Sequence, residues 1–141
     1  IRGGAGGRIP DGNSIFVIET GGLCIGHLGH LHHPLTDQHY ALIGRLDVVM
    51  VPVDGGLTLD LPSMMEVTER LRASIVIPMH WFGTFTLRQF TLGMEEYYRI
   101  VPEQSGRITL SLWDLPTEPE LRVLAPGGGG GLGNGFNRDG P

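Results

Sequence analysis

Histidines are concentrated in one short part of this chain. Five of its six histidines fall within thirteen residues, and they are His27, His30, His32, His33 and His39. The sixth, His80, follows an apolar run much later in the sequence. Neutral imidazoles suit a borderline divalent cation such as zinc, which takes three or four N, O or S ligands. The sequence therefore indicates a metal site if the fold brings these histidines together.

Polar residues follow each of three predicted strands. The His-rich segment 27–33 follows the first strand, Asp54 and two glycines follow the second, and His80 follows the third. In an open parallel sheet, binding sites form outside the carboxyl ends of the strands. If these strands are parallel neighbours, the three loops converge at one edge of the sheet. This convergence favours a metal site there, since a lone histidine at a strand end is more often an ordinary loop residue.

Other residues of the same types are expected to have no such role. His27 alternates with apolar residues of a strand, which indicates a structural or supporting function. His39 is expected on an exposed helix face. Cys24 lies inside an apolar strand, so burial is expected rather than nucleophilic chemistry. The glycines at 3–7 are weak evidence for a phosphate loop, because no strand precedes them and no Gly-Lys-Ser/Thr follows.

The elements that must position these loops follow from periodicity and turn residues. Gly21 and Gly22 mark a hairpin turn, Thr36 is a helix N-cap, and Gly44 ends that helix. The predicted elements are strands at 14–19 and 23–25, a helix at 37–43, a strand at 46–53, a helix capped by Asp60 or Ser63, a strand at 74–78, a helix at 86–99, and strands near 107–112 and 121–124. The unit over 46–78 needs a crossover helix, so its two strands are expected to be parallel. The fold class is therefore α/β, which some schemes would call α+β.

Composition and charge exclude several functions. The chain has 10 basic and 15 acidic side chains, a formal net charge of −5 and a single cysteine. The acidic balance disfavours binding to nucleic acid or an anionic membrane. No apolar run approaches the roughly 20 residues of a membrane-spanning helix, and one cysteine gives no reason to invoke an oxidising compartment. A cytoplasmic protein with a small-molecule substrate is expected, and a homo-oligomer is left open.

Residues 3–125 resemble a known family over the runs NSIFVIETGGLCIGHLGHLHHPLT, LDVVMVPVDGGLTLD and RASIVIPMHWF. They are similar to the C-terminal half of a metallo-β-lactamase-fold metal-dependent hydrolase, in the branch similar to ascorbate-6-phosphate lactonase. The resemblance implies a four-layer αββα sandwich, usually with two zinc ions at the sheet edge. A metal-bound hydroxide would then attack an ester, lactone, amide or phosphodiester. The domain is expected over 1–125, and the Gly-rich segment 126–141 is expected to be a disordered tail.

The resemblance also assigns roles to single residues. His80 matches the last metal-ligand histidine of the family. His30 stands where the family pattern HLGDLGH has a metal-bridging aspartate, and His32 stands where it has a glycine. A neutral imidazole offers one lone pair to one metal, whereas a carboxylate spans two. A single-metal or inactive site is therefore expected, with His33 and Asp54 near it and His32 or His33 as compensating ligands.

The family signature HxHxDH does not occur in these residues. Together with the non-Met start at Ile1, this predicts a fragment that lacks the N-terminal half of its domain and is inactive alone. Such a fragment would expose one apolar sheet face. Two alternatives remain open: a non-catalytic or degenerate protein whose histidines hold metal without turnover, and a gene-model artefact in which one base change turned Asp into His.

Aromatic residues after His80 allow two interpretations. Trp81, Phe82 and Phe85 form either an aromatic wall of a substrate pocket or packing under the following helix.

Overall fold

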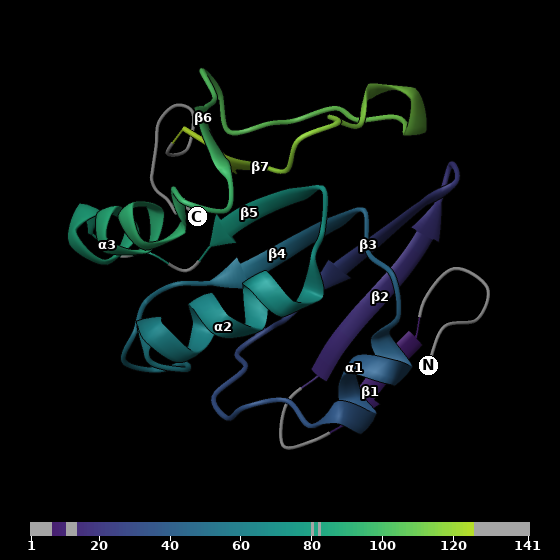
Figure 1. Cartoon of the computed structure of the whole chain (residues 1–141), viewed down its shortest axis with the longest axis horizontal. Helices are drawn as coiled ribbons and strands as arrows, with labels where there is room; N and C mark the ends of the chain where they lie inside the picture. Colours follow the sequence, from purple (N-terminus) through teal and green to yellow (C-terminus); the bar gives the residue numbers. More distant parts are fainter. Residues whose placement is uncertain (1–6, 11–13, 80, 82, 126–141) are drawn as a thin grey trace.

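The computed structural model describes residues 7–10, 14–79, 81 and 83–125. Strands in this part of the chain are β1 (Gly7–Pro10), β2 (Ser14–Thr20), β3 (Leu23–His27), β4 (Val48–Pro52), β5 (Ile75–Met79), β6 (Arg99–Pro102) and β7 (Glu120–Val123). They form one mixed sheet in the order β1-β2-β3-β4-β5-β7-β6 (Figure 1). β2 is antiparallel to β1 and β3, and every other neighbouring pair is parallel. The predicted α/β class is confirmed.

The β2–β3 hairpin turns at two glycines, as predicted. Gly21 and Gly22 have φ angles of +58° and +82°, and the flanking Thr20 and Leu23 are paired. A two-residue hairpin loop that matches the right-handed strand twist needs positive φ at both positions, which glycine adopts without a steric penalty.

Three α-helices and a short 3-10 helix complete the described elements, which are α1 (Asp37–Ile43), α2 (Leu61–Leu71), α3 (Thr84–Met94) and η1 (Leu112–Asp114). Thr36 caps α1 in a reciprocal capping box with His39, so the predicted N-cap is confirmed. Asp60 rather than Ser63 caps α2, because its carboxylate accepts from the backbone N–H of Ser63. None of the helices in the described part of the chain is long and apolar enough to span a membrane.

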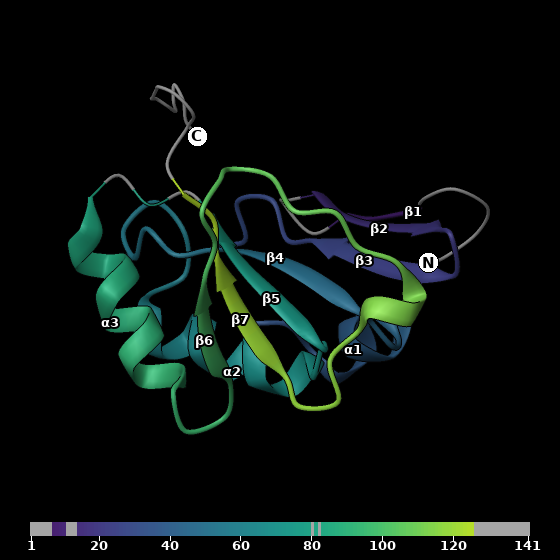
Figure 2. The same ribbon diagram turned by 90° about the horizontal axis from the view of Figure 1, so that it is seen from above.

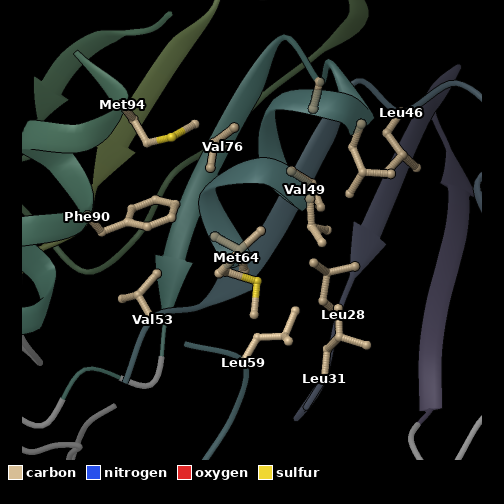
Figure 3. Packing of buried hydrophobic residues seen from close by; sticks show 14 of the residues in the cluster. Leu28, Leu31, Leu46, Val49, Val53, Leu59, Met64, Val76, Phe90 and Met94 are labelled. Carbon is tan, nitrogen blue, oxygen red and sulfur yellow. The ribbon is translucent and has the colours of Figure 1, made fainter. Parts of the chain in front are cut away.

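One face of the sheet packs against the helices (Figure 2). Figure 3 shows Val49 of β4, Val76 of β5 and Met64 of α2 in this core, with Phe90 and Met94 of α3 beside them. All five side chains are fully buried. Because α1 and α2 are the crossovers between parallel strands, their apolar sides cover this face.

The other face of the sheet is only partly covered. Val48, Ile75 and Ile77 are buried there under the segment that links β6 to β7, which contributes Ile108, Leu110 and Leu115. On β2, however, Phe16 and Ile18 are 45% and 42% exposed. The register continues this apolar surface across the sheet, since Ile18 pairs with Ile25 and Ile25 pairs with Val48. The expected exposed apolar sheet face is therefore present on β2.

In the second half of the chain, one predicted helix is present with a different end, and one predicted strand was wrong. The helix predicted over 86–99 ends at Met94, and strand β6 begins at Arg99. The strand predicted near 107–112 has no ladder partner, because its alternating Ile108 and Leu110 pack onto the second core without pairing. Four residues are too few for a local pattern to mark β6, which depends on pairing with β7 and on the Arg99–Glu120 ion pair of 2.8 Å. The predicted tail 126–141 lies outside the described residues.

A buried carboxylate ties the start of β4 to β3. The Asp47 side chain is 1% exposed and pairs with the guanidinium of Arg45, which is 70% exposed. Its second oxygen accepts from the backbone N–H of Cys24 at 2.8 Å, and its own N–H donates to the Cys24 carbonyl. A buried carboxylate stays charged only if its partners replace the water it has lost. Asp47 therefore fixes where β4 enters the sheet.

Replacement of Asp47 should destabilise the fold more than replacement of an exposed partner in a similar ion pair. We expect Asp47→Asn to lower the free energy of unfolding by about 1–3 kcal/mol, because it leaves buried polar groups imperfectly paired. The matched control is Asp37→Asn, which removes the exposed pair with Arg70 and should cost no more than about 1 kcal/mol. Urea unfolding of both variants measures the difference, and equal losses would contradict the assigned role of Asp47.

Candidate metal centre

In the segment after β3, the leucines are buried in the core and the histidines lie nearer the surface. Leu28 and Leu31 are fully buried in the helix-side core, and Figure 3 shows them below Met64. His30 and His32 are exposed, and His33 is half-buried. The leucines thus anchor the backbone of this loop, and imidazoles remain at the surface at the sheet edge.

Backbone hydrogen bonds join the segments at the carboxyl ends of β3, β4 and β5, which we call the strand exits. The N–H of Leu59, in the loop after β4, donates to the carbonyl of Leu31 at 2.9 Å. The N–H of Val53 donates to the carbonyl of Met79 at the end of β5, also at 2.9 Å. Since β3, β4 and β5 are parallel neighbours, the predicted convergence of these exits at one edge is confirmed as far as Met79. His80 itself lies outside the described residues.

Asp54 organises the loop that follows β4. Its Oδ1 accepts from the backbone N–H groups of Gly56, Leu57 and Thr58, at 2.9, 2.8 and 3.1 Å. The hydroxyl of buried Thr58 donates to the same oxygen at 3.1 Å. With Oδ1 engaged in this way, a metal would have to be bound through Oδ2. The sequence analysis did not predict the role of Thr58, although an aspartate followed by two glycines is typical of a turn in which the side chain accepts backbone N–H groups.

His27 has a structural role, as predicted. It ends β3, half-buried, and its Nδ1 accepts from the N–H of Gly29, which has φ of +62°. Burial lowers the pKa of His27 below its ordinary value of 6.5, and nearby His30 lowers it further, against a backbone hydrogen bond that raises it. His27 therefore favours the neutral state that accepts this hydrogen bond.

The remaining histidines make local contacts. His32 Nδ1 lies 3.2 Å from the carbonyl of His30, and the rings of His32 and His33 meet edge to face with centroids 4.8 Å apart. His39 accepts the N–H of Thr36 in the capping box of α1, so this histidine is part of a helix cap. Within the described ranges, no three His, Cys, Asp or Glu side chains are grouped closely enough to hold a metal ion. The described donors therefore fit part of a metal site and do not complete one.

The predictions for Cys24 and Trp81 are confirmed, whereas the packing prediction for Phe85 is wrong. Cys24 is buried in the core, as expected. Trp81 packs partly against that core, as the packing interpretation requires. Phe85 is 69% exposed in the first turn of α3, which contradicts the packing interpretation for this residue. Phe82 lies outside the described residues.

Comparison with known proteins agrees with this architecture. A family model described as a β-lactamase superfamily domain matches residues 2–80, which is more than half of the chain. The chain is 31% identical to a candidate Zn-dependent hydrolase of the metallo-β-lactamase superfamily from Thermotoga maritima, with a TM-score of 0.68 over 84% of this chain and 64% of that protein. No curated protein sequence matches.

Two further solved structures share the fold at lower identity. A candidate metal-dependent hydrolase from Parabacteroides distasonis is 10% identical, with a TM-score of 0.53 over 79% of this chain and 40% of that one. A metallo hydrolase from the archaeon Ignicoccus hospitalis is 21% identical, with a TM-score of 0.52 over 81% and 43%. The chain thus spans less than two thirds of the length of each of these proteins.

The chain belongs to the β-lactamase superfamily, with the fold of its metallo-hydrolases. Its assignment to the C-terminal half of such a domain stays a prediction.

Removal of the Asp54 carboxylate should loosen its loop. We expect Asp54→Ala to cost about 1–3 kcal/mol of stability and to speed amide hydrogen exchange at Gly56, Leu57 and Thr58, because their N–H groups lose their acceptor. Asp60→Ala, at the exposed N-cap of α2, is the matched control and should leave these amides protected. Unchanged exchange at the three amides in Asp54→Ala would contradict the assigned role.

Acid should destabilise the fold through His27. Because its pKa in the folded chain lies below 6.5, the unfolded chain binds a proton first as the pH falls, so the contribution of neutral His27 is present above pH 6.5 and is lost below it. Urea unfolding between about pH 7.5 and 5.5 should show a smaller loss of stability in His27→Gln than in the wild type. The same loss in both proteins would contradict this linkage.

Proposed function

We propose that this chain forms part of a zinc-dependent hydrolase that acts on an ester, lactone, amide or phosphodiester of a small molecule. One observation supports this function: backbone hydrogen bonds hold the three strand exits together at one edge of the sheet. One of these exits is the histidine loop, residues 27–33. Membership of the superfamily supports it as well, since similar structures are described as zinc- or metal-dependent hydrolases. Within the superfamily, we place the chain in the branch similar to ascorbate-6-phosphate lactonase.

His80 and His30 are the proposed metal ligands. The structure describes β5, which ends at Met79, next to His80 in sequence. It also describes the exposed His30 after β3, two strands away across β4. Two imidazoles fall short of the three or four ligands that zinc takes, so the proposal requires further donors. His33 lies on the same loop and Asp54 on the next exit, where either could contribute.

A bound zinc ion would supply a Lewis acid and a water made nucleophilic at neutral pH. The residues of this chain hold and position the surrounding groups. Leu28 and Leu31 fix the backbone of the histidine loop, and neutral His27 closes the turn at Gly29. Asp54 holds the adjacent loop in one conformation. A site preorganised in this way spends little binding energy on ordering its own loops.

A non-catalytic metal-binding protein is the second candidate function. It is favoured by the histidine at position 30, because an imidazole cannot bridge two metal ions as the family aspartate does. Metal bound by the full-length protein without hydrolysis of ester, lactone or phosphodiester substrates would favour this candidate over the hydrolase.

Elemental analysis of the purified protein tests the proposed ligands. We expect His80→Ala to weaken zinc binding by at least roughly 10-fold to 100-fold, because a ligand should matter no less than the groups that orient it. His39→Gln is the matched control, since glutamine serves at the same capping-box position, and this variant should keep the metal.

The same preparations should be assayed with chromogenic ester, lactone and phosphodiester substrates, with and without a chelator. Zinc content that does not respond to His80→Ala would count against the hydrolase site and in favour of metal binding by the 27–33 loop alone.

A further inference from the structure

Two large apolar side chains lie exposed beside the converging strand exits. Leu57, in the loop after β4, is 77% exposed, and Phe85, in the first turn of α3, is 69% exposed. Among the described large hydrophobic residues, only Trp113 is more exposed. Single exposed apolar residues are common on protein surfaces, so what matters is whether these two adjoin each other and the candidate metal centre.

The loop that carries Leu57 rests on the helix turn that carries Phe85. A Cβ placed on Gly55 would lie 3.8 Å from Cγ2 of Thr86, the residue after Phe85. Figure 2 shows the segment after β4 passing beside the start of α3. The two apolar side chains therefore belong to adjoining segments, and we call this pair the apolar rim.

The apolar rim also adjoins the histidine loop. Leu59, two residues after Leu57, donates its N–H to the carbonyl of Leu31, between His30 and His32. The rim and the imidazoles therefore lie at the same edge of the sheet.

The backbone at both rim residues is held in place by hydrogen bonds and by buried neighbours, so both side chains stay exposed. The N–H of Leu57 donates to Asp54 Oδ1 at 2.8 Å, and the neighbouring Thr58 and Leu59 are buried. Phe85 precedes Leu87 and Phe90, which point into the core, so its helix face is set by their burial. Both side chains are thus held at the surface by partners that fix their backbones. Ordered apolar groups of this kind bind an apolar ligand at little cost in conformational entropy.

We propose that Leu57 and Phe85 bind the apolar acyl or alkyl group of the substrate and give the site a preference for longer chains. This inference rests on the proposed function and names its substrate class. A rim of one leucine and one phenylalanine offers dispersion contacts and apolar area, and it offers no hydrogen bond to a sugar hydroxyl. The substrate is then an ester or lactone with an aliphatic chain of several carbons.

Binding of carboxylate products tests the rim without depending on turnover. Acetate and hexanoate should be titrated into the purified protein while the amide NMR signals of Leu57, Thr58 and Thr86 are followed. We expect hexanoate to bind about tenfold more tightly than acetate, because its additional methylenes are partly buried on the rim. Leu57→Ser and Phe85→Ser should each reduce this preference, and the double variant should abolish it.

Leu92→Ser is the matched control, because Leu92 is an exposed leucine, 58% accessible, in the same helix α3. This variant should keep the full preference for hexanoate. A preference that persists in the double variant, or hexanoate shifts that miss these amides, would overturn the proposal.

Hydrolysis of acetyl and hexanoyl esters by the zinc-loaded full-length protein, rather than by this chain alone, separates this inference from the proposed function. Hydrolysis that favours the hexanoyl ester in the wild type and Leu92→Ser, but not in the rim variants, confirms both. Hydrolysis with no chain-length preference in any variant overturns the rim and leaves the hydrolase standing. Hexanoate binding that depends on the rim, with no ester hydrolysed, overturns the proposed function and leaves the rim as a site for an apolar ligand.

Discussion

Parallel pairing of β3, β4 and β5 is the constraint on which the candidate metal centre depends. Each of these strands delivers its following loop to the same edge, because all three run in one direction. An antiparallel β4 would carry Asp54 to the opposite end of the sheet from the histidine loop. The crossovers α1 and α2 make the parallel arrangement possible, and their apolar sides bury the face of the sheet that they cross. Core formation and site formation are thus two results of one topology.

The histidine loop shows how a core can position polar groups. Leu28 and Leu31 are buried in the close-packed core on the helix side, and this packing fixes the position of the loop backbone. His30 and His32 are exposed, one on each side of buried Leu31. His27 is the exception, since burial and its contact with Gly29 favour its neutral form and give it a structural role.

The two faces of the sheet differ in how they are covered. Helices bury one face, whereas the segment between β6 and β7 covers only the middle of the other and leaves Phe16 and Ile18 exposed on β2. The αββα sandwich implied by the family resemblance places a second sheet on a face of this kind. Both the apolar register from β2 to β4 and the partial cover agree with that architecture.

The sequence by itself determined the elements whose signals are local. Gly21 and Gly22 define a turn that needs positive φ, Thr36 and Asp60 cap helices through side chains a few residues away, and a continuous apolar run marked β4. The expected approach of the histidine loop, Asp54 and the end of β5 also followed from sequence, because parallel strands leave little choice about where their exits lie.

Only the tertiary structure decided the features that depend on distant partners. β6 depends on its pairing with β7 and on the ion pair of Arg99 with Glu120, and the alternating Ile108 and Leu110 pack on the face of the sheet without joining a ladder. The sequence placed Asp54 near the candidate site, but only its contacts with Thr58 and the neighbouring backbone showed that it also anchors its loop. The exposure of Leu57 and Phe85 is likewise a property of what surrounds them. Hydrogen bonds between distant segments and burial depend on three-dimensional neighbours, which a residue's own sequence context does not specify.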